Sequence, residues 1–172
     1  MKSKFVTRYK DNPILTKDDI PYQVETVHNA GVTKFDGRYI MLFRSHLDTG
    51  RSIIGIAQSE DGFHFEAGDE PFMTPSKEPV FCEYEEFGVE DPRINPLEGA
   101  YYITYSAYSK HGVRLGLARG RAHPLQNPLQ IGHRKSFFDD QTDAQIKRRT
   151  AAHGDVVDRA VDGQIADAAA RK

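Results

Sequence analysis

Short segments of alternating or continuous apolar residues recur along the first part of the chain, each bounded by turn-forming residues. Residues 39–43 (YIMLF) follow an Asp-Gly turn, residues 52–59 (SIIGIAQS) follow a second turn cluster, and residues 63–65 continue the alternation after another Asp-Gly pair. Asp-Gly pairs beside β-branched and aromatic runs are typical of β-hairpins. The pattern therefore predicts a meander of short antiparallel strands.

The same order of segments returns downstream. Residues 98–109 repeat the first strand and residues 111–119 repeat the second, so that Phe43 aligns with Tyr105 across a period of about 61 residues. A long repeat built from short strands is typical of β-propeller blades, and the excess length places a loop insertion at residues 66–89. We therefore predict an all-β fold with about two blades.

The alternation is lost from residue 119 onward. The last segment is rich in Ala, Asp and Arg and has almost no large apolar side chains. Such a segment forms at most a frayed helix or a disordered tail. We therefore divide the chain into a partial propeller at residues 1–118 and an atypical tail at residues 119–172. Two blades alone leave open sheet edges and an unclosed ring.

Composition narrows the range of partners. The 172 residues suit one domain, and the formal net charge of −2 gives no basic surface of the kind that binds nucleic acid. No apolar segment is long enough to cross a bilayer, and no apolar stretch follows the basic N-terminal residues. Cys82 is the only cysteine, which excludes an internal disulfide. We expect a cytoplasmic protein that binds small polar molecules rather than nucleic acid or membranes.

The segment GVEDPRI at residues 88–94 places two acids, a proline and an arginine before a run of aromatics. One interpretation is a strand entry in which Asp91 and Arg93 form a solvated ion pair, which contributes little to stability. The other is a general acid, which needs a carboxyl group whose pKa is raised by burial or by neighbouring anions. The acids near enough in sequence to be such neighbours are Glu83, Glu85, Glu86 and Glu90. The local pattern leaves both interpretations open.

A second group of polar residues lies in the first repeat. Asn29, Arg44 and Ser45 offer an amide, a planar set of donors and a hydroxyl, which suit sugar hydroxyls or a phosphate. Asn29 and Asp91 both precede the first long predicted strand of their repeat, where propeller loops approach the central axis. Tyr108 belongs to an aromatic stripe that mainly predicts packing, and it is a candidate for stacking on a sugar ring.

Other chemistries find no support in the residue spacing. The histidines lack the spacing of zinc ligands, so we expect no metal site of that type. The chain contains no Walker A sequence, no dinucleotide fingerprint and no G-x-S-x-G element.

Several motifs together resemble the amino-terminal part of glycoside hydrolase family 130, the β-mannoside phosphorylases and their relatives. The resemblance runs from about residue 12 to residue 118, and its specificity comes from the order and spacing of the motifs. The motifs are VHNAG (27–31), LFRSH (42–46), IGIAQSEDGFHF (54–65), GVEDPRI (88–94) and GVRLGLA (112–118).

The resemblance implies a five-bladed β-propeller and inverting phosphorolysis of a β-mannosidic bond to α-mannose 1-phosphate. It implies inorganic phosphate as a co-substrate and no cofactor, and it makes Asp91 the proton donor. The other residues expected at the site are Asn29, Arg44, Ser45, Arg93 and Tyr108 for the sugar and Arg114 for the phosphate.

The resemblance ends where the tail begins, which suggests a frameshifted or truncated product. We expect the chain alone to be inactive or very weak, because the later blades would carry the remaining phosphate ligands. Two alternatives are a β-mannoside hydrolase on the same scaffold and a non-catalytic carbohydrate-binding or relict domain. The sequence leaves open the acceptor sugar and the linkage, and a homo-oligomer is compatible with the family.

Overall fold

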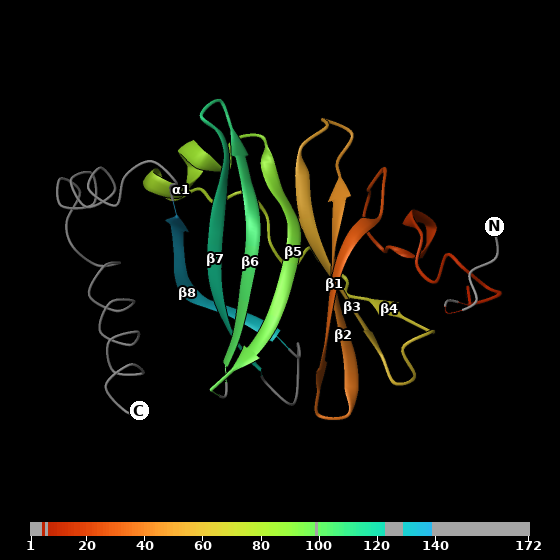
Figure 1. Ribbon diagram of the computed structural model, residues 1–172. Coiled ribbons are helices and arrows are strands. Elements are labelled where there is room, and N and C mark those ends of the chain that lie inside the picture. The colour runs from red at the N-terminus through yellow and green to blue at the C-terminus, as the bar shows by residue number, and fades with distance from the viewer. Residues whose placement is uncertain (1–4, 6, 99, 123–128, 139–172) are drawn as a thin grey trace.

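The computed structural model describes residues 5, 7–98, 100–122 and 129–138. Its strands form one eight-stranded sheet that divides into two four-stranded antiparallel units, joined by a single parallel residue pair (Figure 1). The first unit contains β1 (His28–Phe35), β2 (Arg38–His46), β3 (Ser52–Ser59) and the short β4 (Glu66–Ala67). The second contains β5 (Gly88–Leu97), β6 (Ala100–Ser109), β7 (Gly112–Ala122) and β8 (Leu129–Phe138). A 3-10 turn, η1 (Lys17–Asp19), precedes the first unit, and α1 (Pro79–Tyr84) precedes the second. The predicted all-β fold class is confirmed.

The strands β2, β3, β6 and β7 lie where the sequence predicts strands. The strands β1 and β5 were not predicted. Gly31 in β1 and Pro92 in β5 interrupt the apolar alternation, and both strands carry polar residues at their start. Asn29 and Asp91 therefore lie inside strands, not in loops that precede them.

Residues 63–65 do not form the strand predicted there. The Asp61 carboxylate accepts hydrogen bonds from the backbone N–H groups of Phe63 at 2.8 Å and His64 at 2.9 Å. These donors are used in a turn and are not available for a sheet ladder. The strand β4 begins only at Glu66 and pairs with β3 through two residues.

The second unit continues beyond the predicted domain boundary. β7 extends to Ala122, so residue 118 lies inside a strand, and β8 pairs with β7 from residue 129 to residue 138. The blade pattern therefore extends one strand further than the apolar alternation indicates. The part of the predicted tail at residues 139–172 lies outside the described residues.

The two units share one packing feature on their middle strands. The ring of Phe43 lies over its cross-strand partner Gly55, and the ring of Tyr105 lies over its partner Gly116. A Cβ atom added to either glycine would lie 2.3 Å from the ring carbon Cζ. Only glycine leaves room for the ring at these positions. The face of the ring in turn covers the backbone of the glycine. The predicted alignment of Phe43 with Tyr105 is confirmed.

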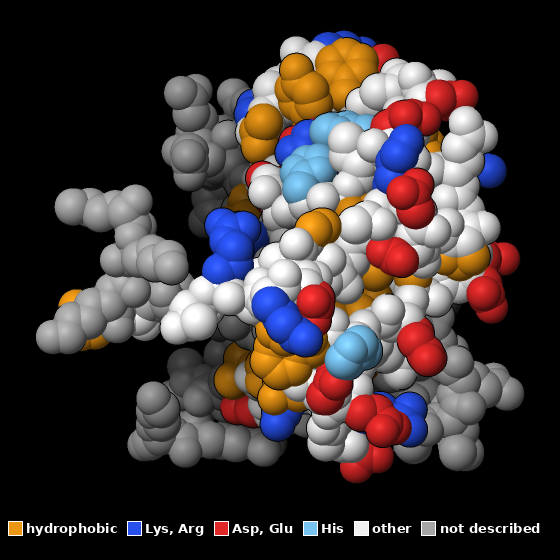
Figure 2. All heavy atoms as spheres, turned by 90° about the vertical axis from the view of Figure 1, so that its right-hand side faces the viewer, with side chains coloured by type: hydrophobic (Ala, Val, Ile, Leu, Met, Phe, Trp, Pro, Cys, Tyr) orange, Lys and Arg blue, Asp and Glu red, His pale blue; other side chains and the backbone are white. Residues whose placement is uncertain are grey.

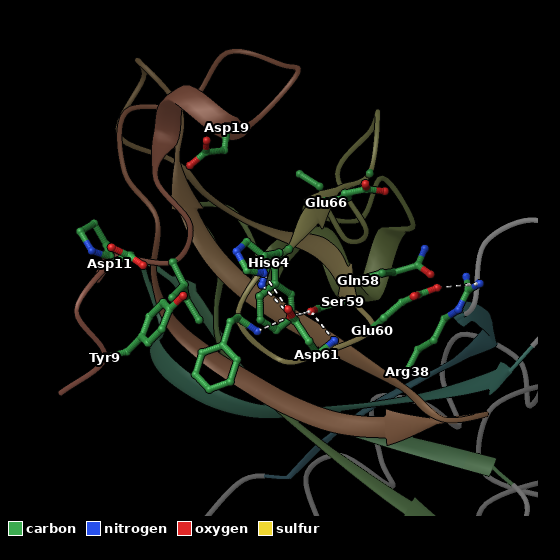
Figure 3. Close-up of a pocket in the computed structure, with 16 residues that line it drawn as sticks. Tyr9, Asp11, Asp19, Arg38, Gln58, Ser59, Glu60, Asp61, His64 and Glu66 are labelled. Carbon is green, nitrogen blue, oxygen red and sulfur yellow. Dashed lines mark hydrogen bonds and ion pairs between the residues drawn. The ribbon is translucent and has the colours of Figure 1, made fainter. Parts of the chain in front are cut away.

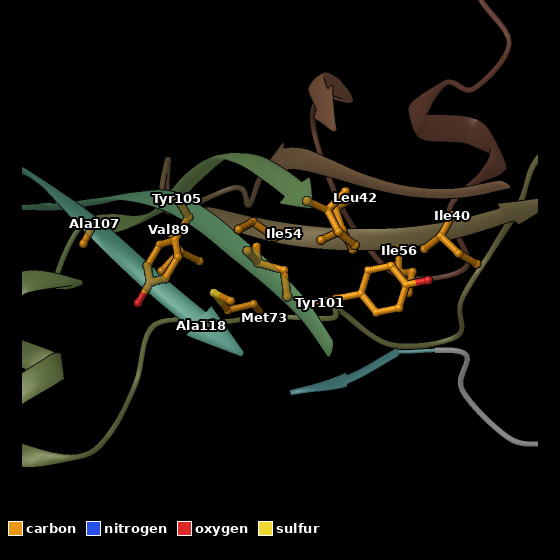
Figure 4. Packing of buried hydrophobic residues seen from close by; sticks show 12 residues of the cluster. Ile40, Leu42, Ile54, Ile56, Met73, Val89, Tyr101, Tyr105, Ala107 and Ala118 are labelled. Carbon is orange, nitrogen blue, oxygen red and sulfur yellow. The ribbon is translucent and has the colours of Figure 1, made fainter. Parts of the chain in front are cut away.

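The main hydrophobic core contains residues of both units (Figure 4). Its buried members include Ile40, Leu42, Ile54, Ile56, Val89, Ile94, Ile103 and Tyr105. A second cluster packs Phe43 and Ile53 against Leu15 and Ile20 of the N-terminal segment. Because side chains alternate along a strand, the faces of β2 are distinct: Arg44 shares the face of Leu42, and Ser45 shares the face of Phe43.

The two units are in close contact at two glycines. Ser52 and Gly88 form the parallel pair that joins β3 to β5, and a Cβ atom at residue 88 would lie 2.6 Å from the Ser52 nitrogen. A Cβ atom on Gly31 would lie 2.6 Å from the carbonyl oxygen of Pro92. β1 therefore approaches β5 backbone to backbone, and this contact requires glycine.

The change Gly31→Ala should lower the free energy of unfolding by about 1–3 kcal/mol, because the added methyl group overlaps the Pro92 carbonyl and forces β1 away from β5. Chemical denaturation followed by circular dichroism measures the effect. The control is Val32→Ala at the exposed next position, which should cost less than about 1 kcal/mol. Equal costs for the two changes would contradict the close approach.

Candidate active site

The site begins with two matching irregularities in β1 and β5. The pairing of β1 with β2 contains one extra residue between His28 and Gly31, and the pairing of β5 with β6 contains one between Glu90 and Arg93. Asn29 and Asp91 adopt positive φ angles of 49° and 51° at these bulges. Asn and Asp are the non-glycine residues that best tolerate this conformation. The repeat therefore places an amide and a carboxylate at equivalent positions.

The two bulges bring Asn29 and Asp91 into direct contact. Asn29 Nδ2 donates to Asp91 Oδ1 at 2.8 Å, and Arg44 Nη1 donates to the same oxygen at 3.1 Å. The Asp91 side chain remains 36% exposed. Within the described part of the chain, no hydrogen bond to Asp91 Oδ2 is found. One carboxylate oxygen is thus held by the protein while the other is open to a ligand.

Arg44 lies at the centre of the polar cluster. Its Nη2 donates to Glu90 Oε1 at 2.6 Å, and its Nε donates to Ser52 Oγ at 3.2 Å. The Ser52 hydroxyl in turn donates to Glu90 Oε1 at 2.8 Å. The side chains of Arg44 and Glu90 are only 17% and 14% exposed, so this ion pair is well shielded from water.

The hydrogen bonds of His46 fix its tautomer. Its Nε2 lies 3.0 Å from Arg44 Nη2, which can only donate, so Nε2 must accept. Its Nδ1 therefore carries the proton and donates to Thr26 Oγ1 at 3.0 Å. The ring of His28 lies 5.1 Å from that of His46. Burial, together with the positive charge of Arg44, lowers the pKa of His28, so this ring is neutral near pH 7.

The ionisation of Asp91 reflects opposing effects. Burial raises the pKa of its carboxyl group, but the hydrogen bonds from Asn29 and Arg44 and the charges of Arg44 and Arg93 outweigh burial. The net result is a pKa below the ordinary value. Asp91 is therefore a carboxylate in the free site, and neither of the two interpretations of the GVEDPRI segment describes it fully. It is ion-paired, yet it is held between two units and not in a solvated strand entry.

The structure separates the other predicted site residues from this cluster. Ser45 is fully buried on the opposite face of β2, so its hydroxyl does not reach the Asp91 cluster. Arg93 donates from Nη1 to the neighbouring Pro92 carbonyl oxygen, and it acts on Asp91 through its charge. Tyr108 is exposed and packs edge to face on Phe87. Arg114 donates to the carbonyl oxygen of Val113 and lies on β7, two strands from Asp91.

Of the acids proposed as neighbours of Asp91, Glu85 lies apart from it and Glu90 lies in its cluster. Glu85 is fully buried and accepts from Tyr105 Oη at 2.6 Å and from the Ser76 backbone at 2.7 Å. It therefore fixes the end of α1 against β6 and does not act on Asp91. Glu90, one of the four acids named as possible neighbours, does join the site. Ser52 and His46 also join it, although the sequence did not single them out. The repeat contained a signal for Glu90, because the bulge pair His28-Asn29 aligns with Glu90-Asp91.

A cleft of about 870 Å³ lies at the other end of β2 and β3, beside the N-terminal segment (Figure 3). Asp61 faces His64 and Ser59 there, and its Oδ2 lies 2.6 Å from His64 Nδ1. These polar groups are used in the turn before β4. Figure 2 shows acidic side chains spread over this face, with a few Lys and Arg side chains between them. The cleft is remote from Asp91 and adds no group to its chemistry.

Neither a metal-binding group nor a membrane-spanning helix occurs among the described residues. They contain no group of three or more His, Cys, Asp or Glu side chains that could hold a metal ion. They also contain no helix with the length and apolar character needed to cross a bilayer.

Comparison with known proteins relates this geometry to a family. A family model described as beta-1,4-mannooligosaccharide phosphorylase matches residues 4–148. The chain is 42% identical to a beta-1,2-mannobiose phosphorylase of Listeria innocua, over 63% of this chain and 45% of the relative. It is 31% identical to a beta-1,2-mannobiose phosphorylase of a Thermoanaerobacter species, over 60% of this chain and 37% of the relative. The chain thus spans less than half the length of these relatives.

A solved structure supports the same assignment. It was described in work reporting that the GH130 family of mannoside phosphorylases contains glycoside hydrolases that target beta-1,2 mannosidic linkages in Candida mannan. The match has a TM-score of 0.61 at 26% identity and covers 73% of this chain and 39% of the other. Because the sequence match extends over most of the chain and the two units superpose on a solved member, the chain belongs to glycoside hydrolase family 130, the mannoside phosphorylase family with a five-bladed β-propeller fold.

Proposed function

We propose that this chain supplies the proton donor and part of the sugar-binding surface of a β-mannoside phosphorylase. The observation that carries the proposal is the state of the Asp91 carboxylate. Its Oδ1 is fixed by Asn29 and Arg44, while its Oδ2 makes no hydrogen bond to the described residues and the side chain remains partly exposed. A carboxyl group held in this way can present one oxygen in a constant direction to a bound ligand.

The reaction needs only one acid. An oxygen of inorganic phosphate bonds to the anomeric carbon of the mannosyl residue while the glycosidic carbon–oxygen bond breaks. The proton of Asp91 goes to the leaving oxygen, which becomes a hydroxyl group, and the sugar is released as α-mannose 1-phosphate. Inverting hydrolases require a second carboxylate because water needs a base, whereas phosphate is already a nucleophile. Phosphate is the co-substrate, and the reaction requires no cofactor.

Asp91 must gain a proton before it can act. In the free site it is a carboxylate, because Asn29 and Arg44 stabilise the charged form. A phosphate dianion placed nearby adds negative charge, and a bound sugar removes water, so both raise the pKa of the carboxyl group. Substrate binding therefore favours the protonated donor.

The chain is proposed to hold only part of the phosphate site. Arg44 and Arg93 are the arginines that act on Asp91, and both also donate hydrogen bonds within the protein. A dianion requires several cationic or N–H donors held in fixed positions. Arg44 and Arg93 alone do not form such a set, so we propose that further donors come from other parts of the family's propeller.

A hydrolase is the second candidate, since a solved relative comes from work on hydrolases within this family. Inverting hydrolysis would require a second carboxylate, roughly 6.5–9.5 Å from the acid, that activates water on the opposite face of the sugar. The acid adjacent to Asp91 in the described chain is Glu90, whose Oε1 is occupied by Arg44 and Ser52. A carboxylate used in this way is a poor base, so Glu90 is not a candidate for the base of a hydrolase.

The role of Asp91 can be tested in a chimera in which residues 12–138, which include both four-stranded units, replace the corresponding part of the Listeria innocua phosphorylase. We expect phosphate-dependent release of mannose 1-phosphate, and we expect Asp91→Asn to lower kcat by about 100-fold or more because the proton donor is lost. Asp36→Asn is the matched control, since Asp36 also has a positive φ angle but lies in the β1–β2 turn. Retention of more than a tenth of kcat in Asp91→Asn would refute the proposal.

The same chimera tests the nucleophile and the linkage. With β-1,2-mannobiose and β-1,4-mannobiose as parallel substrates, we expect turnover to require phosphate and to be faster on the β-1,2 linkage, because the two relatives described above are named as beta-1,2-mannobiose phosphorylases. Chromatography separates mannose from mannose 1-phosphate. Free mannose produced at an equal rate without phosphate would instead support the hydrolase.

The lowered pKa of Asp91 predicts a pH dependence of stability. A carboxyl group whose pKa is lower in the folded than in the unfolded chain stabilises the fold above its ordinary pKa of 3.8, and this contribution is lost as the pH falls through the lowered value. Urea denaturation between about pH 6 and pH 2 should therefore show a smaller difference between the parent chain and Asp91→Asn at the acid end. A difference that stays constant over this range would contradict the assigned ionisation.

A further inference from the structure

Glu90 is adjacent to Asp91 in sequence, yet its carboxylate is directed to the first unit. Its Oε1 accepts from Arg44 Nη2 and from Ser52 Oγ, and Arg44 Nε donates to the same serine hydroxyl. These three contacts form a closed triangle. Ser52 is almost fully buried, and its backbone forms the parallel pair with Gly88, so the triangle is built on the junction of the two units.

The triangle limits the freedom of the Arg44 guanidinium group. An arginine has five N–H donors. The contacts with Ser52, Glu90, His46 and Asp91 use four of them, if each contact takes its own donor. Ser52 holds Nε, and Glu90 and His46 hold Nη2. The planar guanidinium group therefore cannot rotate without breaking these hydrogen bonds. Nη1 is consequently the part of Arg44 that faces Asp91 Oδ1.

We propose that Glu90 is a positioning residue that, with Ser52, holds the Arg44 guanidinium group against Asp91 and so determines the direction in which Asp91 Oδ2 points. Glu90 does not donate the proton and acts through Arg44. This inference rests on the proposed function of Asp91 as the donor. The arrangement separates the two neighbouring acids: Glu90 neutralises and orients the arginine, and Asp91 keeps one oxygen open.

The comparison of Glu90→Ala with Glu90→Gln tests the proposal on the 172-residue chain itself. Both variants lose the charge of Glu90, but glutamine keeps an oxygen at the position that accepts from Arg44 and Ser52. The readout is the titration of the Asp91 carboxyl carbon by nuclear magnetic resonance, assigned with the Asp91→Asn variant. We expect the Asp91 midpoint to be higher in Glu90→Ala than in Glu90→Gln, because only alanine releases Arg44. Identical midpoints in two folded variants would overturn the proposal.

The controls separate positioning from a general loss of structure. Glu60 pairs with Arg38 at 3.6 Å on an exposed surface beyond the far end of β3, so Glu60→Ala and Glu60→Gln should leave the Asp91 midpoint unchanged. If Glu90→Ala does not fold, Glu90→Asp replaces it: aspartate keeps the charge but is one methylene group shorter. We then expect a midpoint above that of the parent chain, and an unchanged midpoint would overturn the proposal.

The two hypotheses fail in different experiments. If Asp91→Asn remains active in the chimera while Glu90→Ala shifts the Asp91 midpoint, Glu90 positions a carboxylate that is not the donor. If Asp91→Asn is inactive while Glu90→Ala and Glu90→Gln titrate identically, Asp91 is the donor and Glu90 does not position it.

Discussion

The site depends on the contact between the backbones of β1 and β5 at Gly31 and Pro92. Neither strand alone supplies all the polar groups of the site, because Asn29 lies on β1 and Asp91 on β5. Because a Cβ atom at residue 31 would meet the Pro92 carbonyl oxygen, the absence of a side chain allows the strands to come close enough for Asn29 to reach Asp91. The matching bulges then direct both polar side chains into the same space. Packing of the apolar core holds the two units together. The contact between Gly31 and Pro92 determines how the units are aligned.

The polar cluster extends across the same junction. Four side-chain hydrogen bonds of this cluster run from the first unit to the second, two of them to Asp91 and two to Glu90. A shielded charge is costly unless it is paired and hydrogen-bonded, and here two acids share one arginine with a serine and an amide as neutral donors. The cluster therefore couples the relative position of the units to the environment of Asp91. A small rotation of one unit would change all four distances.

The sequence was sufficient for the middle strands and for the grouping of Asn29, Arg44 and Asp91, because the strands alternate and the motifs recur in a fixed order. It was insufficient for β1 and β5, where Gly31 and Pro92 interrupt the periodicity that identifies strands. Ser45 shows a different limit. Arg44 and Ser45 are neighbours on a regular strand, so they face opposite sides, and the alternation itself argues against a shared site. The role of Glu90 depends on a bulge, and a bulge changes the direction of side chains in a way that alternation does not predict.

Asn29 and Asp91 occupy the same position in two copies of one structural unit, and they differ by an amide nitrogen in place of a carboxylate oxygen. Two carboxylates in hydrogen-bond contact would share a proton, and the pKa of one of them would be raised strongly. The amide instead donates to Asp91 and keeps it charged until a substrate arrives. Asn29 thus contributes, with Arg44 and Arg93, to the resting charge of the proposed acid, and the two equivalent bulge positions of a near-symmetric pair of strands carry one carboxylate instead of two.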